Sequence, residues 1–317
     1  MNTIDLNCLP PAFLQRVDEL LSTDERAQWE ASLRSRPLSV RWTGPSEDVA
    51  SGRDYLVEHG LSPQVVPWCS DAWSFAAGSH ALLTSLPWVD QQTLFMQSLS
   101  SIAAVEAMGI EPGHDVLDVC AAPGAKTSLI RRRQGDRGIL IANELSRVRS
   151  RRMHSLLKRL GVANVEVITR PGEQLGSSHE RCFDRVLVDV PCSGEGRIHP
   201  SNPASWSRWS ESAIRGLARR QESLLESACR AARPGGVILY ATCTMAPEEN
   251  EGVIDRVLRR ARTPIELVDI GLPLVESRPG MTEWRGTTFA KDVGRAVRII
   301  GSDTMTPFFM ARIQRVD

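Results

Sequence analysis

The feature that most constrains this chain is the alternation of apolar strand patterns with helical patterns from residue 97 onward. The predicted strands cover residues 115–119, 138–142, 165–168, 183–189, 236–241, 295–299 and 308–313. The predicted helices cover residues 99–108, 127–133, 146–160, 212–232 and 250–260. Because strands that alternate with helices form parallel sheets covered on both faces, the pattern predicts a doubly wound, Rossmann-like α/β domain.

The N-terminal part of the chain follows a different pattern. Apolar residues recur at helical intervals over residues 11–33, and a strand at 38–42 and a helix at 46–59 are predicted after them. A length of 317 residues is enough for one large domain and a smaller one. We therefore expect a small N-terminal α/β module over residues 1–85 and the larger domain over residues 86–317.

Charge is balanced over the whole chain, with 38 Lys and Arg against 38 Asp and Glu. The total therefore neither favours nor excludes a nucleic-acid partner. Positive charge is concentrated in residues 131–133, in residues 147–152 with Lys158 and Arg159, and in residues 256–262. Each cluster is either a phosphate-binding surface or an ordinary solvated helix face.

The seven cysteines are irregularly spaced, with no repeated Cys-x-x-Cys pair and no matching histidines. This spacing argues against zinc sites and disulfide frameworks, so we predict reduced thiols and no metal site. The N-terminus lacks a basic leader followed by an apolar run, and no segment is long and apolar enough to span a bilayer. The sequence therefore predicts a soluble, cytoplasmic protein.

The segment DVCAAPGAKT, residues 118–127, follows the first predicted strand. Ligands of doubly wound sheets bind at this position, where small residues let the backbone approach a cofactor and the helix N-terminus offers free amides. Glu144 ends the second strand, where an acidic residue accepts both hydrogen bonds from a ribose diol. Together these features predict an adenosine-containing cofactor, and the lack of Gly-x-Gly-x-x-Gly argues against a dinucleotide. The alternatives are a tight turn without a ligand and a Glu144 that only caps a helix.

Cysteines follow two further predicted strands. Asp189 and Cys192 come at the end of the fourth strand, and Cys243 follows the fifth within a Thr-Cys-Thr sequence. Because neighbouring parallel strands end at one edge of a sheet, both thiols and the carboxylate are expected over the same rim. A single buried cysteine is usually inert packing, but packing is a poor explanation for two at adjacent strand ends.

These motifs resemble those of the RNA 5-methylcytosine methyltransferases, the NOL1/NOP2/sun group with its bacterial rRNA members. The similar segments are residues 118–127, 143–149, 189–196, 233–236, 240–244, 247–251 and 308–312, with Asn202, Pro203, Trp206 and Gln221. The resemblance covers roughly residue 90 to the end, and the N-terminal part is similar to the small module that precedes this catalytic domain in bacterial members. It implies a class I methyltransferase fold, S-adenosylmethionine as the cofactor, an RNA partner and an RNA-recognition-like N-terminal module.

The resemblance also implies which residues form the site. The catalytic residues would be Cys243, Cys192 and Asp189. The cofactor-binding residues would be Cys120, Ala121, Ala122, Pro123, Gly124, Ala125, Lys126, Glu144, Arg149 and Asp189.

The chemistry of cytosine explains why such residues are needed. Its C5 atom is too weak a nucleophile to take a methyl group unaided, so a thiolate must first add at C6. The family gives that role to Cys243, while Asp189 stabilises or protonates N3 and Cys192 serves the removal of the C5 proton. Cytosine-5 DNA methyltransferases attack instead with a Pro-Cys cysteine, which leaves Cys192 as the rival nucleophile.

One segment departs from the family pattern. The family usually has an Asp after the third strand that meets the adenine ring, whereas residues 169–173 are Thr-Arg-Pro-Gly-Glu here. Either Glu173 substitutes for that Asp, or backbone and apolar contacts hold the adenine. Because the chain ends at Asp317, directly after the last predicted strand, RNA capture is expected from the N-terminal module, the arginine clusters or an accessory protein.

The sequence thus favours an enzyme that methylates C5 of a cytosine in structured RNA, and it favours ribosomal RNA over tRNA. The alternative is a non-catalytic RNA-binding assembly factor on the same scaffold. The intact set of Cys192, Cys243 and Asp189 argues against that alternative, while the altered segment at Pro171 argues mildly for it. The motifs disfavour DNA or a small molecule as the substrate.

Overall fold

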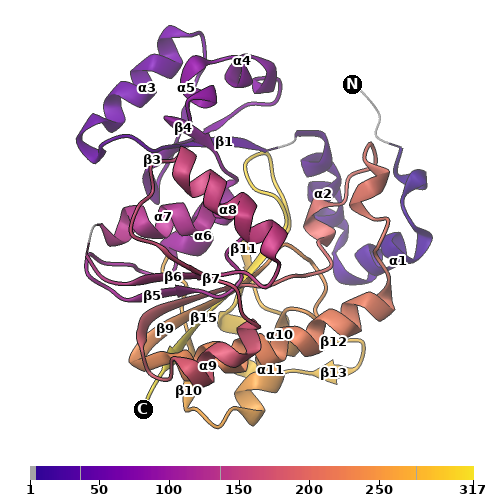
Figure 1. Ribbon diagram of the computed structural model, residues 1–317. Coiled ribbons are helices and arrows are strands. Elements are labelled where there is room, and N and C mark those ends of the chain that lie inside the picture. The colour runs from indigo at the N-terminus through magenta and orange to yellow at the C-terminus, as the bar shows by residue number, and fades with distance from the viewer. Residues whose placement is uncertain (1–4, 36, 136, 276) are drawn as a thin grey trace.

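The computed structural model describes residues 5–35, 37–135, 137–275 and 277–317, and its centre is a nine-stranded sheet (Figure 1). The strands along it run in the order β11-β14-β15-β9-β8-β5-β6-β7, and β10 pairs with β15. The five parallel strands are β5 (Val116–Asp118), β6 (Leu140–Asn143), β7 (Glu166–Ile168), β8 (Phe183–Asp189) and β9 (Ala232–Thr242). The antiparallel strands are β10 (Ile265–Val268), β11 (Ser277–Pro279), β14 (Val297–Ile299) and β15 (Phe308–Arg315).

Helices cover both faces of this sheet, with α6, α7 and α8 on one side and α9, α10 and α11 on the other (Figure 1). Their bounds are α6 (Leu99–Glu106), α7 (Ala125–Gln134), α8 (Arg147–Arg159), α9 (Leu175–Ser178), α10 (Glu211–Ala231) and α11 (Glu251–Arg260). Alternate residues of β8 enter different cores, since Val186 and Val188 pack with α10 and Leu187 packs with α6 and α7. Strands buried on both faces explain the continuous apolar runs in the sequence, and the predicted doubly wound, Rossmann-like fold is confirmed.

Some elements differ from the sequence prediction. Strand β9 starts at Ala232, which the helical pattern had assigned to the preceding helix. Strands β10 and β11, and the hairpin of β12 (Glu283–Trp284) and β13 (Thr287–Thr288), were not predicted at all. All four strands have at most four residues, and β11 and β13 are polar, so they carry little of the apolar periodicity on which strand prediction depends.

The N-terminal region contains a second, antiparallel sheet of order β2-β3-β1-β4. Its elements are β1 (Leu38–Trp42), α3 (Val49–Glu58), β2 (Gln64–Val66), β3 (Cys69–Phe75), α4 (His80–Thr84), α5 (Pro87–Asp90) and β4 (Leu94–Met96). It has its own apolar core, in which Val40 and Leu56 are fully buried. The proposed division between residues 85 and 86 stays a prediction, and we note that β4 carries this sheet as far as Met96.

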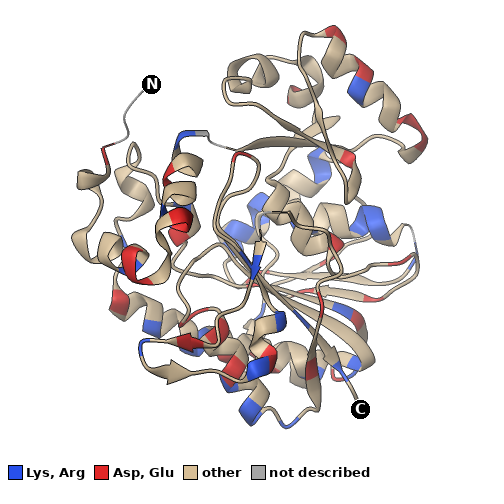
Figure 2. Ribbon diagram, turned by 180° about the vertical axis from the view of Figure 1, so that it is seen from behind, with Lys and Arg blue, Asp and Glu red and all other residues tan. Residues whose placement is uncertain are grey.

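The first two helices, α1 (Pro11–Leu20) and α2 (Thr23–Ser35), do not pack with that N-terminal sheet. Their buried residues Phe13, Val17 and Trp29 share a core with α10 and the large sheet. Both views show these helices apart from α3, α4 and α5 (Figures 1 and 2). Within the described ranges, no helix has the length and apolar character to cross a bilayer.

Candidate active site

The carboxyl ends of the parallel strands β8 and β9 open into a cavity of about 550 Å³. Asp189 is the last residue of β8, Cys192 follows it in the next loop, and Cys243 directly follows β9. All three line the cavity, together with Lys126 and Arg149. The structure therefore brings the three predicted catalytic residues to one place, as expected for neighbouring strand ends.

The two thiols of this cavity are in direct contact, with 3.3 Å between the sulfur atoms of Cys192 and Cys243. The hydrogen bond with Cys192 lowers the pKa of Cys243, and the positive charges of Arg197 and Lys126 act in the same direction, against burial and the charge of Asp189. The same contact, together with burial, raises the pKa of Cys192 well above its ordinary value. Of the two thiols, the arrangement thus makes Cys243 the one that loses its proton more readily.

Asp189 is held by an ion pair that reaches it from α7. The Lys126 ammonium donates to its Oδ2 at 2.7 Å, and about 29% of the Asp189 side chain stays exposed to the cavity. Burial alone would lower the pKa of Lys126, but the charge of Asp189 and this hydrogen bond raise it. Lys126 therefore remains charged and fixes the orientation of the carboxylate beside the thiols.

The loop between β5 and α7 contains Ala121, Ala122, Pro123 and Gly124, which brings its backbone close to the cavity. Gly124 has a φ of +106°, and a Cβ added there would lie 2.9 Å from Cγ of Met153. Both the backbone conformation and the packing therefore require glycine at this position. Ala125 then begins α7, whose free amides point toward the same end of the sheet.

Asp118 places a buried carboxyl group beneath this loop. Its Oδ2 accepts a hydrogen bond from Thr127, whereas its Oδ1 has no hydrogen-bond partner among the described residues. Asp118 also lines a pocket of about 250 Å³ that shares Lys126 and Asp189 with the large cavity. Burial raises the pKa of Asp118 to about 7. A buried oxygen without a partner is costly, so the site is suited to a ligand that donates a hydrogen bond or carries positive charge.

Glu144 lies at the end of β6 in a neighbouring cleft of about 180 Å³. Its Oε1 accepts from the amide of Ser146 at 2.8 Å, and its Oε2 lies 3.2 Å from Arg149. Arg149 also donates to the carbonyl of Ala122 at 2.9 Å, which ties α8 to the loop after β5. Glu144 thus contacts the start of α8, as the helix-capping alternative expects. The same carboxylate also lines the cleft, where the cofactor prediction expects a ribose.

The altered segment after β7 places Glu173 away from this cleft. Glu173 forms an ion pair with Arg220 at 2.9 Å, and it is Arg220 and Gly172 that line the cleft. A Cβ on Gly172 would lie 2.6 Å from Leu224, so this wall is tightly packed. Glu173 thus pairs with Arg220 and is not among the residues that line the cleft, and the contact of the adenine ring stays a prediction.

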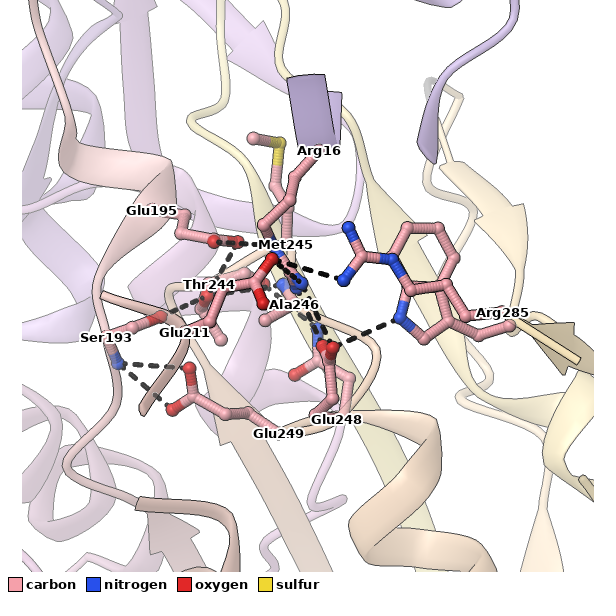
Figure 3. A network of polar contacts seen from close by, with 12 residues as sticks. Arg16, Ser193, Glu195, Glu211, Thr244, Met245, Ala246, Glu248, Glu249 and Arg285 are labelled. Atoms are coloured by element: carbon pink, nitrogen blue, oxygen red, sulfur yellow. Dashed lines mark hydrogen bonds and ion pairs between the residues drawn. The ribbon is translucent and has the colours of Figure 1, made fainter. Parts of the chain in front are cut away.

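A network of buried polar groups supports both cysteine loops (Figure 3), and although the family resemblance included their segments, it gave these residues no role. Glu249 accepts from the amide of Ser193 at 3.0 Å and from Gln221 at 2.7 Å, next to Cys192. Glu195 accepts from the hydroxyl of Thr244 at 3.1 Å, next to Cys243. Burial raises the pKa of Glu249 to about 7 and raises that of Glu195.

Arg16 of α1 extends this network to the N-terminal helices (Figure 3). Its guanidinium lies 2.7 Å from Glu248 and 3.9 Å from Glu195, and only 5% of its side chain is exposed. No local pattern points to this contact, because Arg16 and Glu248 are separated by 232 positions. Helix α1 is therefore part of the support of the catalytic loops.

The three arginine clusters have different surroundings. In α7, Arg132 and Arg133 both pair with Asp71 of the N-terminal sheet, at 2.8 and 2.6 Å. Both interpretations of residues 131–133, a phosphate surface or a solvated face, are therefore wrong. By contrast, the arginines of α8 are exposed. Over the whole molecule, Lys and Arg are interspersed with Asp and Glu (Figure 2).

No group of three or more His, Cys, Asp or Glu side chains within the described residues is placed to hold a metal ion. The donor set of the site is instead one of carboxylates and thiols around small residues. The orphaned Asp118 oxygen, the close approach at Gly124 and the carboxylate of Glu144 fit an amino-acid and ribose-bearing cofactor.

Comparison with solved structures supports the fold. A methyltransferase homolog protein from Pyrococcus horikoshii is 26% identical with a TM-score of 0.76, covering 97% of this chain and 100% of that one. NSun6 from Pyrococcus horikoshii, solved with SFG, is 19% identical with a TM-score of 0.78, covering 99% of this chain and 100% of that one. The fold is that of the class I methyltransferases, which use S-adenosylmethionine.

Comparison with curated proteins gives the family. Ribosomal RNA small subunit methyltransferase F of Serratia proteamaculans is 31% identical over 268 residues, and that of Salmonella typhi is 33% identical over 268 residues. Each match covers 83% of this chain and 56% of the relative, so the chain spans little more than half their length. The sequence model of the family described as 16S rRNA methyltransferase RsmB/F matches residues 105–314. These matches confirm the resemblance found in the sequence, and the chain belongs to the RsmB/F family of 16S rRNA methyltransferases.

Proposed function

We propose that this protein transfers a methyl group from S-adenosylmethionine to C5 of a cytosine in ribosomal RNA, with Cys243 as the nucleophile. The observation that carries the proposal is the pair of thiols 3.3 Å apart beside Asp189, in one cavity at the sheet edge. Family membership supports RNA as the substrate, since the curated relatives are named for the small ribosomal subunit. A ribosomal substrate also supports a cytoplasmic location.

The residues of the cofactor side suit S-adenosylmethionine. The unpaired Oδ1 of Asp118 suits an ammonium group, and the carboxylate of Glu144 suits two ribose hydroxyls. The loop of small residues after β5 leaves space for the methionine moiety. When bound, the cofactor supplies an electrophilic methyl group to the cavity.

The first step assigned to the protein is the attack on the base. The Cys243 thiolate, stabilised by the hydrogen bond from Cys192, adds to C6 of cytosine and forms a carbon–sulfur bond. The electrons displaced from the C5–C6 bond make C5 nucleophilic, while negative charge develops toward N3. N3 takes up a proton from solvent, and the Asp189 carboxylate, oriented by Lys126, is placed to accept the hydrogen bond from the resulting N3–H group.

The second step is the release of the product, for which the pair of thiols offers a physical explanation. The negative charge of Cys243 is one of the causes that raise the pKa of Cys192. Once Cys243 is bound to the base, that charge is gone and Cys192 loses its own proton to solvent more readily. The Cys192 thiolate then removes the C5 proton, the electrons of that bond restore the C5–C6 double bond and expel Cys243 as a thiolate, and N3 returns its proton to solvent.

RNA capture is proposed for the exposed basic face of α8. This face carries Arg151, Arg152, Lys158 and Arg159, none of which has an ion-pair partner among the described residues. Phosphates are attracted by charge that is free rather than paired, so α8 suits them better than α7. The RNA-recognition-like role of the N-terminal module, residues 1–85, and the need for an accessory protein remain parts of the proposal.

The experiment is a mass-spectrometric identification of the methylated nucleoside. The purified protein is incubated with S-adenosylmethionine in three separate reactions. Each reaction contains one unmethylated substrate, which is deproteinised 16S rRNA, assembled small subunits or tRNA. Digestion and mass spectrometry are expected to find 5-methylcytidine in the ribosomal samples. Cys243→Ala should abolish it, whereas Cys182→Ala, which removes an exposed cysteine outside the cavity, should not.

The other outcomes decide between the alternatives. Methylation of tRNA alone would make tRNA the substrate. Tight binding of ribosomal RNA without any methylated nucleoside would favour the non-catalytic assembly factor. A methyl group on another atom would overturn the assignment to C5.

A further inference from the structure

A second pocket, of about 340 Å³, lies beside the active-site cavity and is not used by the chemistry above. The two share the lining residues Arg197 and Thr306, so they are neighbours. The walls of the second pocket come from α2, from the loop after Cys192 and from the loop before β15. Its volume lies within the range of about 300 to 1,000 Å³ that is usual for ligand sites.

Arg197 marks the junction between the two spaces. Its side chain is exposed, and no carboxylate of the described chain lies within ion-pair distance of it. It packs against Gly194, where an added Cβ would lie 2.9 Å from Arg197 Nη2. A guanidinium without a partner, at the entrance to a site for RNA, is well suited to bind a phosphate in two-point fashion.

Flat and apolar groups form the body of the second pocket. Leu33 and Pro307 provide apolar surface on opposite elements. The ring of His199 is fixed between the Leu33 carbonyl at 2.9 Å and the Ser201 hydroxyl at 2.7 Å. Because these bonds occupy both ring nitrogens, the imidazole is held rigidly in the pocket lining, which suits it to stack against a base.

Asn202 adds a polar group at the exposed side of the same pocket. Its side-chain amide makes no hydrogen bond among the described residues. An amide offers both donors and an acceptor to the edge of a base. The pocket therefore combines a stacking surface, a free amide and a cation, which is the combination that proteins use for unstacked nucleotides.

We propose that this pocket holds the nucleotide next to the target cytosine, with Arg197 on the phosphate that joins the two. The inference rests on the proposed function, because it takes single-stranded RNA as the occupant. It assigns to α2 and the loop around His199 a direct part in choosing the sequence context of the target. The amide of Gly196, in the pocket wall, donates a hydrogen bond to the carbonyl of Cys243 at 3.0 Å. This bond connects the wall of the pocket directly to the backbone of the nucleophile.

The test uses a labelled single-stranded RNA of nine nucleotides with one central cytidine in a uridine background. Two matched RNAs carry an abasic riboside on the 5′ or the 3′ side of that cytidine. Fluorescence anisotropy is expected to show that one abasic RNA, but not the other, binds about 5- to 100-fold more weakly, as loss of a stacked base predicts. Methylation of the same RNAs is measured in parallel.

Asn202→Trp fills the pocket and should remove this difference, so that the intact RNA and both abasic RNAs bind equally. Ala204→Trp is the matched control, since Ala204 is exposed, lies two positions away and does not line the pocket. It should keep the wild-type difference. Arg197→Gln should reduce the dependence of affinity on salt by about one phosphate contact, whereas Arg197→Lys should largely retain it.

Equal binding of all three RNAs by the wild-type protein would overturn the inference and leave the proposed function standing. The same holds if Asn202→Trp still discriminates the abasic RNA, which would instead suit a pocket reserved for a protein segment. If discrimination is present but no RNA is ever methylated, the proposed catalytic function fails while the nucleotide pocket survives.

Discussion

Helices α7 and α8 are both rich in arginine, yet their arginines have different roles. In α7, Arg132 and Arg133 are tied to Asp71, whose side chain is only 6% exposed, and Arg133 also pairs with Glu106 at 2.7 Å. In α8, the arginines face outward, apart from Arg149, which turns back to Glu144. The role of an arginine cluster thus depends on whether another element brings a carboxylate to it, and the cluster's own sequence does not contain that information.

The contacts of α7 also explain how the N-terminal sheet is attached. Arg41 of β1 is 1% exposed, and it donates to Gln97 at 2.9 Å and to Ser128 of α7 at 2.8 Å. Burial lowers the pKa of Arg41 to about 10. A buried charge is costly when it loses a partner, so we expect the loss of one hydrogen-bond partner of Arg41 to destabilise the interface between β1 and α7.

The largest effect in this comparison is expected from Asp71→Asn. It removes the charge that Arg132 and Arg133 share in a mostly buried environment and leaves Arg133 with Glu106 alone, which should cost about 3 to 5 kcal/mol of unfolding free energy. Asp54→Asn is the control, because Asp54 is exposed on α3 and should change stability by less than about 0.5 kcal/mol. Chemical denaturation followed by circular dichroism measures both, and similar losses in the two variants would contradict the account of α7.

The ion pairs of Asp71 also make the unfolding free energy depend on pH. Burial alone would raise the pKa of Asp71, but hydrogen bonds from Arg133, Cys69 and Arg132 hold it well below its usual range. Because the pKa is lower in the folded state, the ionised carboxylate stabilises the fold fully at pH values above the unfolded-state pKa of about 3.9. This stabilisation is lost as the pH falls below that value. The difference between the wild type and Asp71→Asn should therefore be constant above about pH 5 and shrink below pH 4.

The next effect concerns the start of α8. Glu144→Ala should weaken S-adenosylmethionine binding by about 1 to 3 kcal/mol, because it removes the acceptor for two ribose hydroxyls. Isothermal calorimetry on the purified variant measures this, with Glu166→Ala, at an exposed position of β7, as the control. Unchanged affinity would mean that Glu144 serves only Ser146 and Arg149.

A smaller effect distinguishes the outer face of α8. The double variant Arg151→Ala and Arg152→Ala should change the unfolding free energy by less than about 0.5 kcal/mol per position, because both side chains are exposed. Its affinity for RNA should fall, and the slope of log affinity against log salt should flatten by about one unit for each phosphate that the variant no longer binds. An unchanged slope would remove α8 from the RNA surface.

The smallest effect is expected for α11, which has an arginine that is exposed like those of α8 but paired with a carboxylate like those of α7. The exposed side chain of Arg259 pairs with the buried carboxylate of Asp255, four positions before it, at 2.9 Å, and Asp255 also accepts a hydrogen bond from the amide of Ala290. Arg259→Ala should therefore cost about 0.3 to 0.5 kcal/mol in thermal or chemical unfolding and leave the salt dependence of RNA binding unchanged. A loss above about 2 kcal/mol would show that this partly exposed pair acts like the buried pair of α7.

Much of the fold was predictable because the strands that build the sheet are apolar on both faces. Val186, Leu187 and Val188 each enter a core, so the run is visible in the sequence without knowledge of its partners. The relative position of Cys192 and Cys243 was predictable for a related reason, since β8 and β9 end at the same edge. Local pattern and sheet topology are enough for such features.

Features that depend on distant partners were not predictable. Arg16 supports the loop of Cys243 through Glu195 and Glu248, which lie more than half the chain away. Asp71 likewise determines what the arginines of α7 do. Arg197 had no recognisable signal, because its importance comes from having no partner at the junction of two cavities. Long-range pairing of charges leaves no periodic trace in a sequence.

The central claim, that Cys243 attacks the base and Cys192 releases it, is tested most directly by covalent capture. Cys192→Ala and Cys243→Ala are each incubated with S-adenosylmethionine and unmethylated ribosomal RNA, and the products are separated by denaturing electrophoresis. The account predicts a methylated protein–RNA adduct that accumulates with Cys192→Ala and is absent with Cys243→Ala, since only the latter lacks the attacking thiolate. The reverse pattern, with an adduct formed by Cys243→Ala alone, would contradict the account and make Cys192 the nucleophile.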